Sequence, residues 1–350
     1  MSEIHSRLPQ RVHANENAPR ERAHAPAELL ALLADGQELS GSALAMRLGV
    51  TRAAVWKQIE QLRMLGLPIH AVAGRGYRLV APVELLDASR IATSVSPEQR
   101  QRVGDIEVHW QIDSTNSALA RGAATSPAPR ACLAEIQTHG RGRRGRAWQM
   151  PLAGGLALSF FRRFDGGMAS LSGLSLLAGI AVLRALGDCG VQGAGLKWPN
   201  DVVVDGRKLA GLLVELGGDA LGPCHAIIGI GMNFRIDPTH GATIDQPWTD
   251  LAALTGERIP SRNLLAARIL SRLAEALDTF ASAGFVAFEK EYAGYDALRN
   301  RPIAVVSGGD SWFGTAKGVN SRGALRAERD GVEVELDSAD VRVRDREALP

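Results

Sequence analysis

The stretch GRGRRGR, Gly140–Arg146, decides the fold class because two interpretations of the chain separate there. Its glycine spacing matches the G-x-G-x-x-G pattern of dinucleotide-binding folds, and it follows a predicted strand over Ala131–Gln137. That pattern requires a helix to begin at the third glycine, so that a pyrophosphate lies on the helix N-terminus. Here the next residues, Ala147–Gly155, include a proline and two glycines and lead into another predicted strand, Leu156–Phe161. A doubly wound dinucleotide fold is therefore excluded.

Four arginines in seven positions give this segment, the arginine loop, its own chemistry. Guanidinium groups bind phosphate and carboxylate through paired hydrogen bonds, and the glycines let the backbone approach a ligand closely. One interpretation is a clamp that folds over a polyanion such as a triphosphate. The alternative is a solvated basic loop that contacts nucleic acid or no ligand at all.

Length and composition indicate a folded multidomain protein. The chain has 350 residues, of which 45% are hydrophobic and 22% are charged. At about 100–200 residues per domain, two or three domains are expected, and the apolar fraction excludes wholesale disorder. The three cysteines have no metal-ligand spacing, which argues against a zinc module and a disulfide scaffold. Neither a membrane span nor a secretory signal is recognisable, so we expect a cytoplasmic protein.

The pattern of apolar residues divides the chain into four parts. We expect a disordered tail over residues 1–25, a winged helix-turn-helix over 26–83, an α+β domain over 84–297, and a small β-barrel over 298–350. The third part contains predicted strands over Ile106–Ile112, Ala131–Gln137, Leu156–Phe161, Val202–Val204, Leu209–Glu215 and Ala226–Ile230, and predicted helices over Leu171–Leu186 and Asn263–Phe280. Most connections are too short for repeated β-α-β crossovers, which favours a mixed or antiparallel sheet. Five short alternating runs after Arg301 are typical of a small barrel.

The second part has the pattern of a DNA-binding module. In its third helix, Val55, Ile59 and Leu62 share an inward face, so small, amide and basic side chains point outward. Such side chains can read base edges and contact phosphates when the helix lies in a major groove. The predicted DNA-binding residues are Thr51, Arg52, Ala53, Lys57, Gln61, Arg75 and Arg78. The alternative is a three-helix packing module whose basic face is only solvated.

Five motifs resemble those of biotin protein ligases. They are Asp113–Asn116, Gly140–Arg146 with Trp148, Lys197–Asp201, Arg207–Gly211 and Gly229–Asn233, and they occur in the family's order. With the winged helix and the C-terminal barrel, the layout is similar to that of the bifunctional biotin ligase and biotin operon repressor. The resemblance implies a ligase domain like those of class II synthetases and an SH3-like barrel.

The resemblance also implies a two-step reaction. Biotin and ATP give biotinoyl-5′-AMP and pyrophosphate, and a lysine ε-amine of biotin carboxyl carrier protein then attacks the adenylate and releases AMP. The implied catalytic residues are Lys197 and Arg143. The implied biotin-binding residues are Ser114, Thr115, Asn116, Gln137, Gly140, Arg141, Gly142, Arg143, Lys197 and Gly211. The implied ATP-binding residues are Arg144, Arg146, Trp148, Asn200, Lys208 and Asn233, and Asp201 is the expected Mg²⁺ ligand.

The implied partners are the carrier protein and operator DNA, with no membrane. Ordering of the arginine loop by the adenylate is expected to favour a homodimer. Lipoate ligases have a similar catalytic fold, and the arginine loop favours biotin. Two alternatives stay open: a ligase whose helix-turn-helix no longer regulates transcription, and a ligand-sensing regulator without ligase activity.

Overall fold

The structure, a computed structural model, describes residues 18–123, 126–307, 310–337 and 341–345. Contacts within the chain define two compact units. One contains residues up to Met64 together with Pro68–Pro82, and the other contains Leu65–Leu67 and the residues from Val83 onward. Within the described residues, every helix is too short or too polar to span a lipid bilayer.

The first unit is a helix-turn-helix with a wing, as the sequence predicts. Its elements are α1 (Ala18–Leu33), α2 (Gly41–Leu48), α3 (Arg52–Met64), β1 (Ile69–Val72) and β2 (Gly76–Leu79). The inward residues of α3, Val55, Ile59 and Leu62, are fully buried. The Ser40 hydroxyl accepts a hydrogen bond from Ala43 N at 3.1 Å and thereby caps α2. Buried apolar contacts and a capped helix therefore fix the orientation of α3.

The predicted disordered tail is wrong over its last eight residues. Residues 18–25 form the first half of α1, and residues 1–17 lie outside the described residues. The prediction relied on the scarcity of apolar side chains before Ala27. Six of the eight residues 18–25 are alanine, arginine or glutamate, which are good helix formers.

A mixed sheet of seven strands forms the centre of the second unit, in the order β3-β4-β5-β9-β8-β7-β6. The strands are β3 (Asp105–Ile112), β4 (Arg130–Gln137), β5 (Gly155–Phe164), β6 (Gly195–Lys197), β7 (Asp201–Val204), β8 (Arg207–Gly218) and β9 (Cys224–Asn233). β3 and β4 are parallel, and the other neighbouring pairs are antiparallel. The prediction of a mixed sheet is confirmed, and β6 is a strand that the apolar pattern does not predict.

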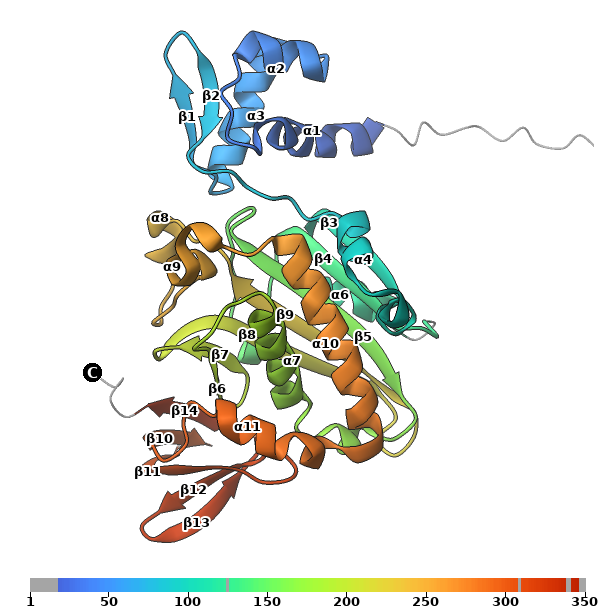
Figure 1. The fold of residues 1–350 in the computed structure, drawn as a ribbon, viewed down its shortest axis with the longest axis vertical. Helices are drawn as coiled ribbons and strands as arrows, with labels where there is room; N and C mark the ends of the chain where they lie inside the picture. The colour runs from blue at the N-terminus through green and yellow to red at the C-terminus, as the bar shows by residue number, and fades with distance from the viewer. Residues whose placement is uncertain (1–17, 124–125, 308–309, 338–340, 346–350) are drawn as a thin grey trace, which may run out of the picture. The chain divides into compact units, whose positions relative to one another are not determined.

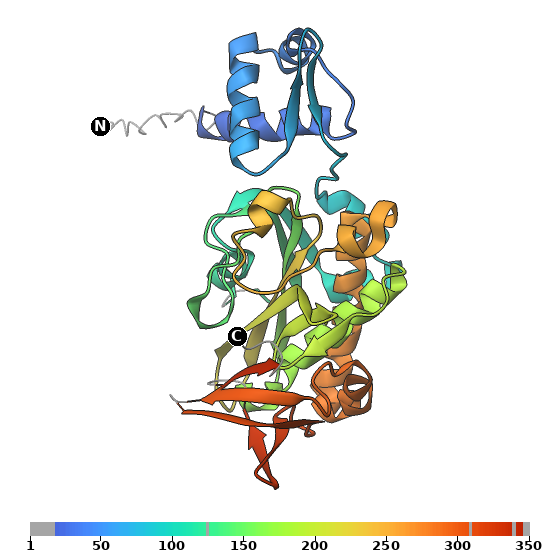
Figure 2. The same cartoon turned by 90° about the vertical axis from the view of Figure 1, so that its left-hand side faces the viewer.

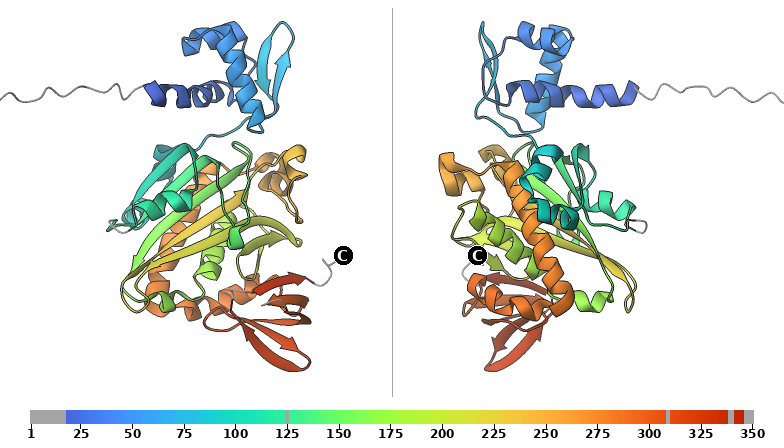
Figure 3. Two further views of the ribbon diagram at one scale, coloured as in Figure 1. Left: turned by 180° about the vertical axis from the view of Figure 1, so that it is seen from behind. Right: turned by 45° about the vertical axis from the view of Figure 1, so that its right-hand side comes forward.

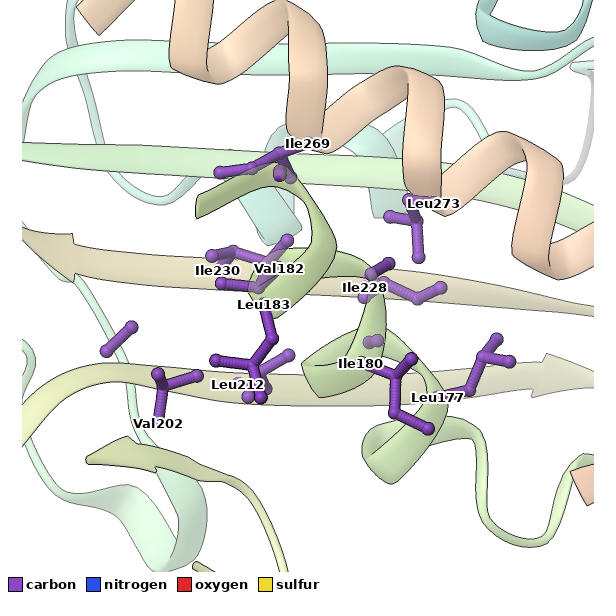
Figure 4. Close-up of a cluster of buried hydrophobic side chains, with 14 of the residues drawn as sticks. Leu177, Ile180, Val182, Leu183, Val202, Leu212, Ile228, Ile230, Ile269 and Leu273 are labelled. Atoms are coloured by element: carbon purple, nitrogen blue, oxygen red, sulfur yellow. The ribbon is translucent and has the colours of Figure 1, made fainter. Parts of the chain in front are cut away.

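The two faces of this sheet are covered differently. The long helices α7 (Leu174–Asp188) and α10 (Arg262–Ala283) pack on one face (Figure 1). Figure 4 shows Leu183 of α7 and Leu273 of α10 in the buried cluster with Ile228 of the sheet. Burying each such side chain contributes about 1.5–3 kcal/mol, so this face anchors the domain.

The opposite face carries α6 (Thr115–Arg121). Leu119 of α6 packs in a separate cluster with Phe161 and Ile227, whereas the neighbouring residues Phe160 and Ile228 belong to the main core. Because adjacent residues of a strand point to opposite faces, α6 lies on the side away from α7 and α10. The left view of Figure 3 shows this face, with the strands in front of α10.

Five antiparallel strands follow at the C-terminal end, in the order β13-β12-β11-β10-β14. They are β10 (Pro302–Ser307), β11 (Asp310–Val319), β12 (Leu325–Arg329), β13 (Val332–Leu336) and β14 (Val341–Asp345), and they match the five predicted runs. A bulge between Ala316 and Gly318 interrupts the register of β11 and β12. The helix α11 (Glu289–Tyr295) lies beside this sheet (Figure 2). The Trp198 indole donates to Gly323 O at 3.1 Å, which joins this sheet to the segment between β6 and β7.

Shorter helical segments complete the described fold. They are α4 (Ala88–Ser94), α5 (Arg100–Val103), α8 (Pro238–Gly241) and α9 (Leu251–Thr255), with 3₁₀ turns at Pro97–Gln99, Arg143–Gly145, Met168–Leu171, Gly256–Arg258 and Phe285–Phe288.

Candidate active site

A cavity of about 60 Å³ lies on the face of the sheet that carries α6, next to the arginine loop. Eleven of the sequence-predicted site residues line it: Ser114, Thr115, Asn116, Gln137, Arg141, Gly142, Arg143, Trp148, Asn200, Lys208 and Gly211. Leu212, Leu213, Gly229, Ile230 and Gly231 complete the lining. Residues from all five motifs thus meet at one place, which we call the first cavity.

One side of the first cavity is a hydrogen-bonded network. Gln137 Oε1 accepts hydrogen bonds from Thr115 N at 2.9 Å and from Thr115 Oγ1 at 3.1 Å. The Ser159 hydroxyl lies 2.5 Å from Asn116 Oδ1 and 2.7 Å from Thr115 Oγ1. Ser114, Thr115, Asn116 and Ser159 are all buried. We call Ser114, Thr115, Asn116, Gln137 and Ser159 the network wall, because the side chains of all but Ser114 are held by one another without a ligand.

Ser114 stands at the start of α6 and is available to a ligand. Ser114 occupies the N-cap position of α6, but its side chain makes no capping hydrogen bond. Its hydroxyl therefore remains at the cavity lining, where Ser114 is 4% exposed.

Glycines make room for this arrangement on β9. A Cβ atom at Gly229 would lie 2.4 Å from Asn116 Oδ1, and one at Gly231 would lie 2.4 Å from Trp148 Cε2. Real Cβ atoms do not approach other atoms so closely, so a larger residue at either position would displace the cavity side chain. Both glycines stand in the Gly229–Asn233 motif, where their alternate spacing puts them on one face of the strand.

The arginine loop forms the other side of the first cavity. Gly142 N donates to Arg146 O at 2.7 Å, and Trp148 N donates to Gly140 O at 2.8 Å, so the loop folds back on itself. Arg144 has a left-handed φ of 58° within the 3₁₀ turn. Arg141, Arg144 and Arg146 are exposed, whereas Arg143 is half-buried over the cavity. Burial lowers the pKa of Arg143, and the neighbouring Arg144 adds to that effect.

A second cavity of about 300 Å³ shares Trp148 and Lys208 with the first. Its other lining residues are Arg146, Ala147, Gln149, Asn233, Thr243, Ile244, Asp245, Gln246 and Trp248. The Lys208 ammonium lies 5.5 Å from the centre of the Trp148 ring. Asn233 donates to Thr249 O at 3.0 Å and holds this segment against β9. The two cavities therefore meet at a cation and an indole.

Lys197 and Asp201 line neither cavity, although their segment connects two strands next to the site. Lys197 ends β6 and is paired in register with Asp201 at the start of β7. Asp201 Oδ1 lies 2.7 Å from Lys208 Nζ. The Lys197 ammonium has no hydrogen-bond or ion-pair partner among the residues that the structure describes. Gly140 and Arg144 also lie outside both linings.

The candidate DNA-binding residues lie on α3 and the wing of the first unit. Arg52, Ala53 and Lys57 are exposed and Gln61 is half-buried. Two of these candidates have polar contacts within the first unit. The Thr51 hydroxyl accepts a hydrogen bond from Ala54 N, and Arg75 forms an ion pair with Glu38 at 2.7 Å, while Arg78 on β2 is exposed.

Several site residues escape the sequence analysis. Ser159 lies in an apolar strand and Glu215 at the end of an apolar run, so nothing in their local pattern distinguishes them. Trp248 and the segment from Thr243 to Gln246 belong to no recognised motif. Gly229 and Gly231 carry a readable signal, because two glycines at alternate strand positions indicate a close approach on one face.

Comparisons with known proteins agree with this geometry. Residues 108–233 match the profile of the family described as "Biotin/lipoate A/B protein ligase family", and residues 27–78 match an HTH domain. The bifunctional ligase/repressor BirA of Salmonella typhimurium is 38% identical over 309 residues, which cover 88% of this chain and 93% of that protein. The corresponding protein of Escherichia coli is 37% identical over 307 residues, with coverage of 88% and 93%. The biotin protein ligase from Aquifex aeolicus, solved in complex with biotin and ATP, matches with a TM-score of 0.59 at 26% identity, covering 69% of this chain and 98% of that chain.

Proposed function

Because this chain belongs to the biotin/lipoate A/B protein ligase family, in its bifunctional ligase/repressor group, we propose that it attaches biotin to a lysine of biotin carboxyl carrier protein. The observation that carries this proposal is the pair of adjoining cavities, which share Trp148 and Lys208 beside the arginine loop. One cavity is lined by hydrogen-bonding groups suited to a ureido ring. The other is larger and suited to a nucleotide.

We assign the two half-reactions to this pair of cavities. The biotin carboxylate attacks the α-phosphorus of ATP, a P–O bond forms, and pyrophosphate leaves with the electrons of the broken bond. The ε-amine of the carrier lysine then attacks the carbonyl carbon of biotinoyl-5′-AMP, loses a proton and expels AMP. The first step brings two anions together and the second expels an anionic leaving group, so positioning and charge neutralisation by this chain's cations supply the catalysis.

Each cation has a place in this scheme. Lys197, a compact ammonium without a partner among the described residues, is assigned to the reacting carboxylate and α-phosphate oxygens. Arg143 closes over the acyl phosphate, and Arg144 and Arg146 offset the triphosphate charge. Ser114, Thr115, Asn116, Gln137, Gly140, Arg141, Gly142 and Gly211 are assigned to biotin, and Trp148, Asn200, Lys208 and Asn233 to ATP.

We assign Mg²⁺ to Asp201, as an ion that arrives with ATP. Mg²⁺ is commonly held by one or two carboxylates together with substrate phosphates and water. Asp201 supplies one carboxylate, and its partner Lys208 is a cation that the phosphates can also bind. In the described part of the chain no group of three or more His, Cys, Asp or Glu side chains forms a metal site, so phosphates and water would complete the coordination.

The ligase proposal is tested by incubating the protein with ATP, Mg²⁺, labelled biotin and purified carrier protein. We expect label on one carrier lysine. A Lys197→Ala variant should lose at least about 100-fold in adenylate formation, because a transition-state cation is removed. Glu289→Ala, a change on α11 outside both cavities, serves as a control. A carrier without label would refute the ligase assignment, and near-normal adenylate formation by Lys197→Ala would refute the role of Lys197.

We also propose that residues 26–83 bind operator DNA and repress biotin-synthesis genes, as a homodimer favoured by the adenylate. The support is the helix-turn-helix match and the exposed Arg52, Lys57 and Arg78. Residues 84–297 are assigned to catalysis and 298–350 to the C-terminal barrel, and we place both activities in the cytoplasm. A gel shift on the biotin-synthesis promoter, with and without biotin and ATP, tests the repressor. An unshifted promoter under both conditions would leave a ligase whose winged helix no longer regulates transcription.

A further inference from the structure

Glu215 is a carboxylate that the proposed reaction does not use, yet it touches both sides of the first cavity. It lies on β8 on the same strand face as Gly211 and Leu213, which line the cavity, and it stands just outside that lining. Its Oε2 accepts a hydrogen bond from Asn116 Nδ2 at 2.7 Å. Its Oε1 and Oε2 lie 3.1 and 3.4 Å from Arg141 Nη2.

The contact with Asn116 fixes the orientation of a buried amide. Asn116 directs Nδ2 to Glu215 and to Leu213 O, and Oδ1 to the Ser159 hydroxyl. Both ends of the amide therefore have partners, which determine its orientation at the cavity. A hydrogen bond to a charged acceptor is stronger than a neutral one, so Glu215 contributes most to this orientation.

The contact with Arg141 fixes one end of the arginine loop to the sheet. The ion pair is partly exposed, with side-chain exposures of 44% for Arg141 and 37% for Glu215. Exposed pairs of this kind are worth little and are weakened by salt. Such a pair is suited to a loop that must release and reclose during each reaction cycle.

We propose that Glu215 is a positioning residue with two separable effects, an inference that rests on the proposed function. Through Asn116 it sets the affinity for biotin. Through Arg141 it sets how long the closed loop retains biotinoyl-5′-AMP. The same carboxylate thus links occupancy of the biotin site to closure of the loop over the reactive intermediate.

Two variants separate these effects. In Glu215→Gln the amide oxygen can still accept from Asn116, but the negative charge facing Arg141 is gone. We expect the Kd for biotin, measured by calorimetry, to stay within about 2-fold, and release of synthetic biotinoyl-5′-AMP to become about 3-fold faster. In Glu215→Ala both contacts are lost. We expect biotin binding to weaken about 20-fold, because a buried amide loses its charged partner.

The salt dependence of adenylate release distinguishes an electrostatic role of Glu215 from a purely structural one. Raising the salt concentration should speed adenylate release from the unsubstituted protein more than from Glu215→Gln, so that the difference between their release rates narrows. Glu107→Gln on β3, whose carboxylate faces His109 at 3.3 Å, is the matched control and should behave like the unsubstituted protein.

Each outcome decides between defined possibilities. The inference would be overturned if the Kd for biotin and the release rate of biotinoyl-5′-AMP stayed within 2-fold of the unsubstituted protein in both Glu215→Gln and Glu215→Ala. It would also be overturned if the two variants changed the Kd and the release rate by equal factors. Failure of the unsubstituted protein to bind biotin would refute the proposed function, and the inference would fall with it. Thermal unfolding of each variant shows whether it is folded, and the isosteric Glu215→Gln variant keeps the test decisive if Glu215→Ala does not fold.

Discussion

The two sides of the first cavity are built in opposite ways. The network wall is buried, and the side chains of Thr115, Asn116, Gln137 and Ser159 are hydrogen-bonded to neighbours from α6, β4, β5 and β8. The arginine loop is held mainly by its own backbone and places three of its four arginines in solvent. One side is therefore prepared before ligand binding, and the other is arranged to move.

The first cavity is small for a ligand site. Ligand pockets commonly occupy about 300–1,000 Å³. The first cavity measures about 60 Å³, and we expect the exposed arginine loop to be the part of its lining that shifts when a ligand enters. A preorganised wall gives affinity and selectivity, while a loop that closes afterwards excludes water from a labile anhydride. Each prediction below alters one side of the cavity and measures whether the other side is affected.

The largest effect is expected from overfilling the network wall. In Gly229→Ala the new methyl group would have to displace Asn116, which hydrogen bonds to three groups hold in place. We expect biotin binding to weaken about 30-fold, a typical consequence of overpacking, as measured by calorimetry. Gly187→Ala is the matched control, because a Cβ there meets no atom within 4 Å. Unchanged biotin affinity in Gly229→Ala would mean that Asn116 does not define the site.

A smaller and different effect is expected from the arginine loop. Arg143→Ala removes the half-buried guanidinium over the cavity and leaves the network wall intact. We expect release of biotinoyl-5′-AMP to become about 10-fold faster, with the Kd for biotin alone within about 3-fold, because this guanidinium is assigned to the acyl phosphate, which free biotin lacks. Radiolabelled adenylate trapped on a filter measures the release, and the exposed Arg100→Ala serves as the control. A loss of biotin affinity equal to the gain in release rate would erase the distinction between the two sides.

The smallest functional effect is expected behind the network wall, at Cys132. Burial beneath α6 raises the pKa of this thiol to about 12, from 9.0 for a free thiol. The thiol therefore keeps its proton in the folded protein, and the stability it contributes is complete below pH 9 and is lost as the pH rises toward 12. At pH 8 we expect iodoacetamide to modify Cys132 at least about 10-fold more slowly than half-buried Cys189, with or without biotin, as read by mass spectrometry. Equal rates of modification of Cys132 and Cys189 would show that the residues covering Cys132 open as readily as the half-buried surroundings of Cys189.

Much of the fold could be predicted because its signals are local. Six strands of the central sheet, the two long helices and the five C-terminal strands follow from apolar periodicity and from glycine and proline boundaries. The strand β6 (Gly195–Lys197) and the start of α1 could not be predicted in this way. β6 is too short to show a period, and the start of α1 is made mostly of good helix formers without an apolar periodicity in the sequence.

The site was predictable only where residues cluster along the chain. Ten of the eleven predicted residues that line the first cavity lie in the motifs, because a loop or a helix start keeps functional groups adjacent in sequence. Ser159 and Glu215 act through partners 43 and 99 positions away, on strands whose pairing only the folded sheet establishes. Trp248 reaches the second cavity from a segment after α8, and no local pattern marks it.

Hydrogen exchange with and without biotin and ATP tests the contrast between the two sides most directly. The account predicts that the backbone amides of Gly140–Trp148 exchange at least about 10-fold more slowly when both ligands are present, while those of α6 change little. Unchanged exchange in the arginine loop, or equal slowing in α6, would contradict it.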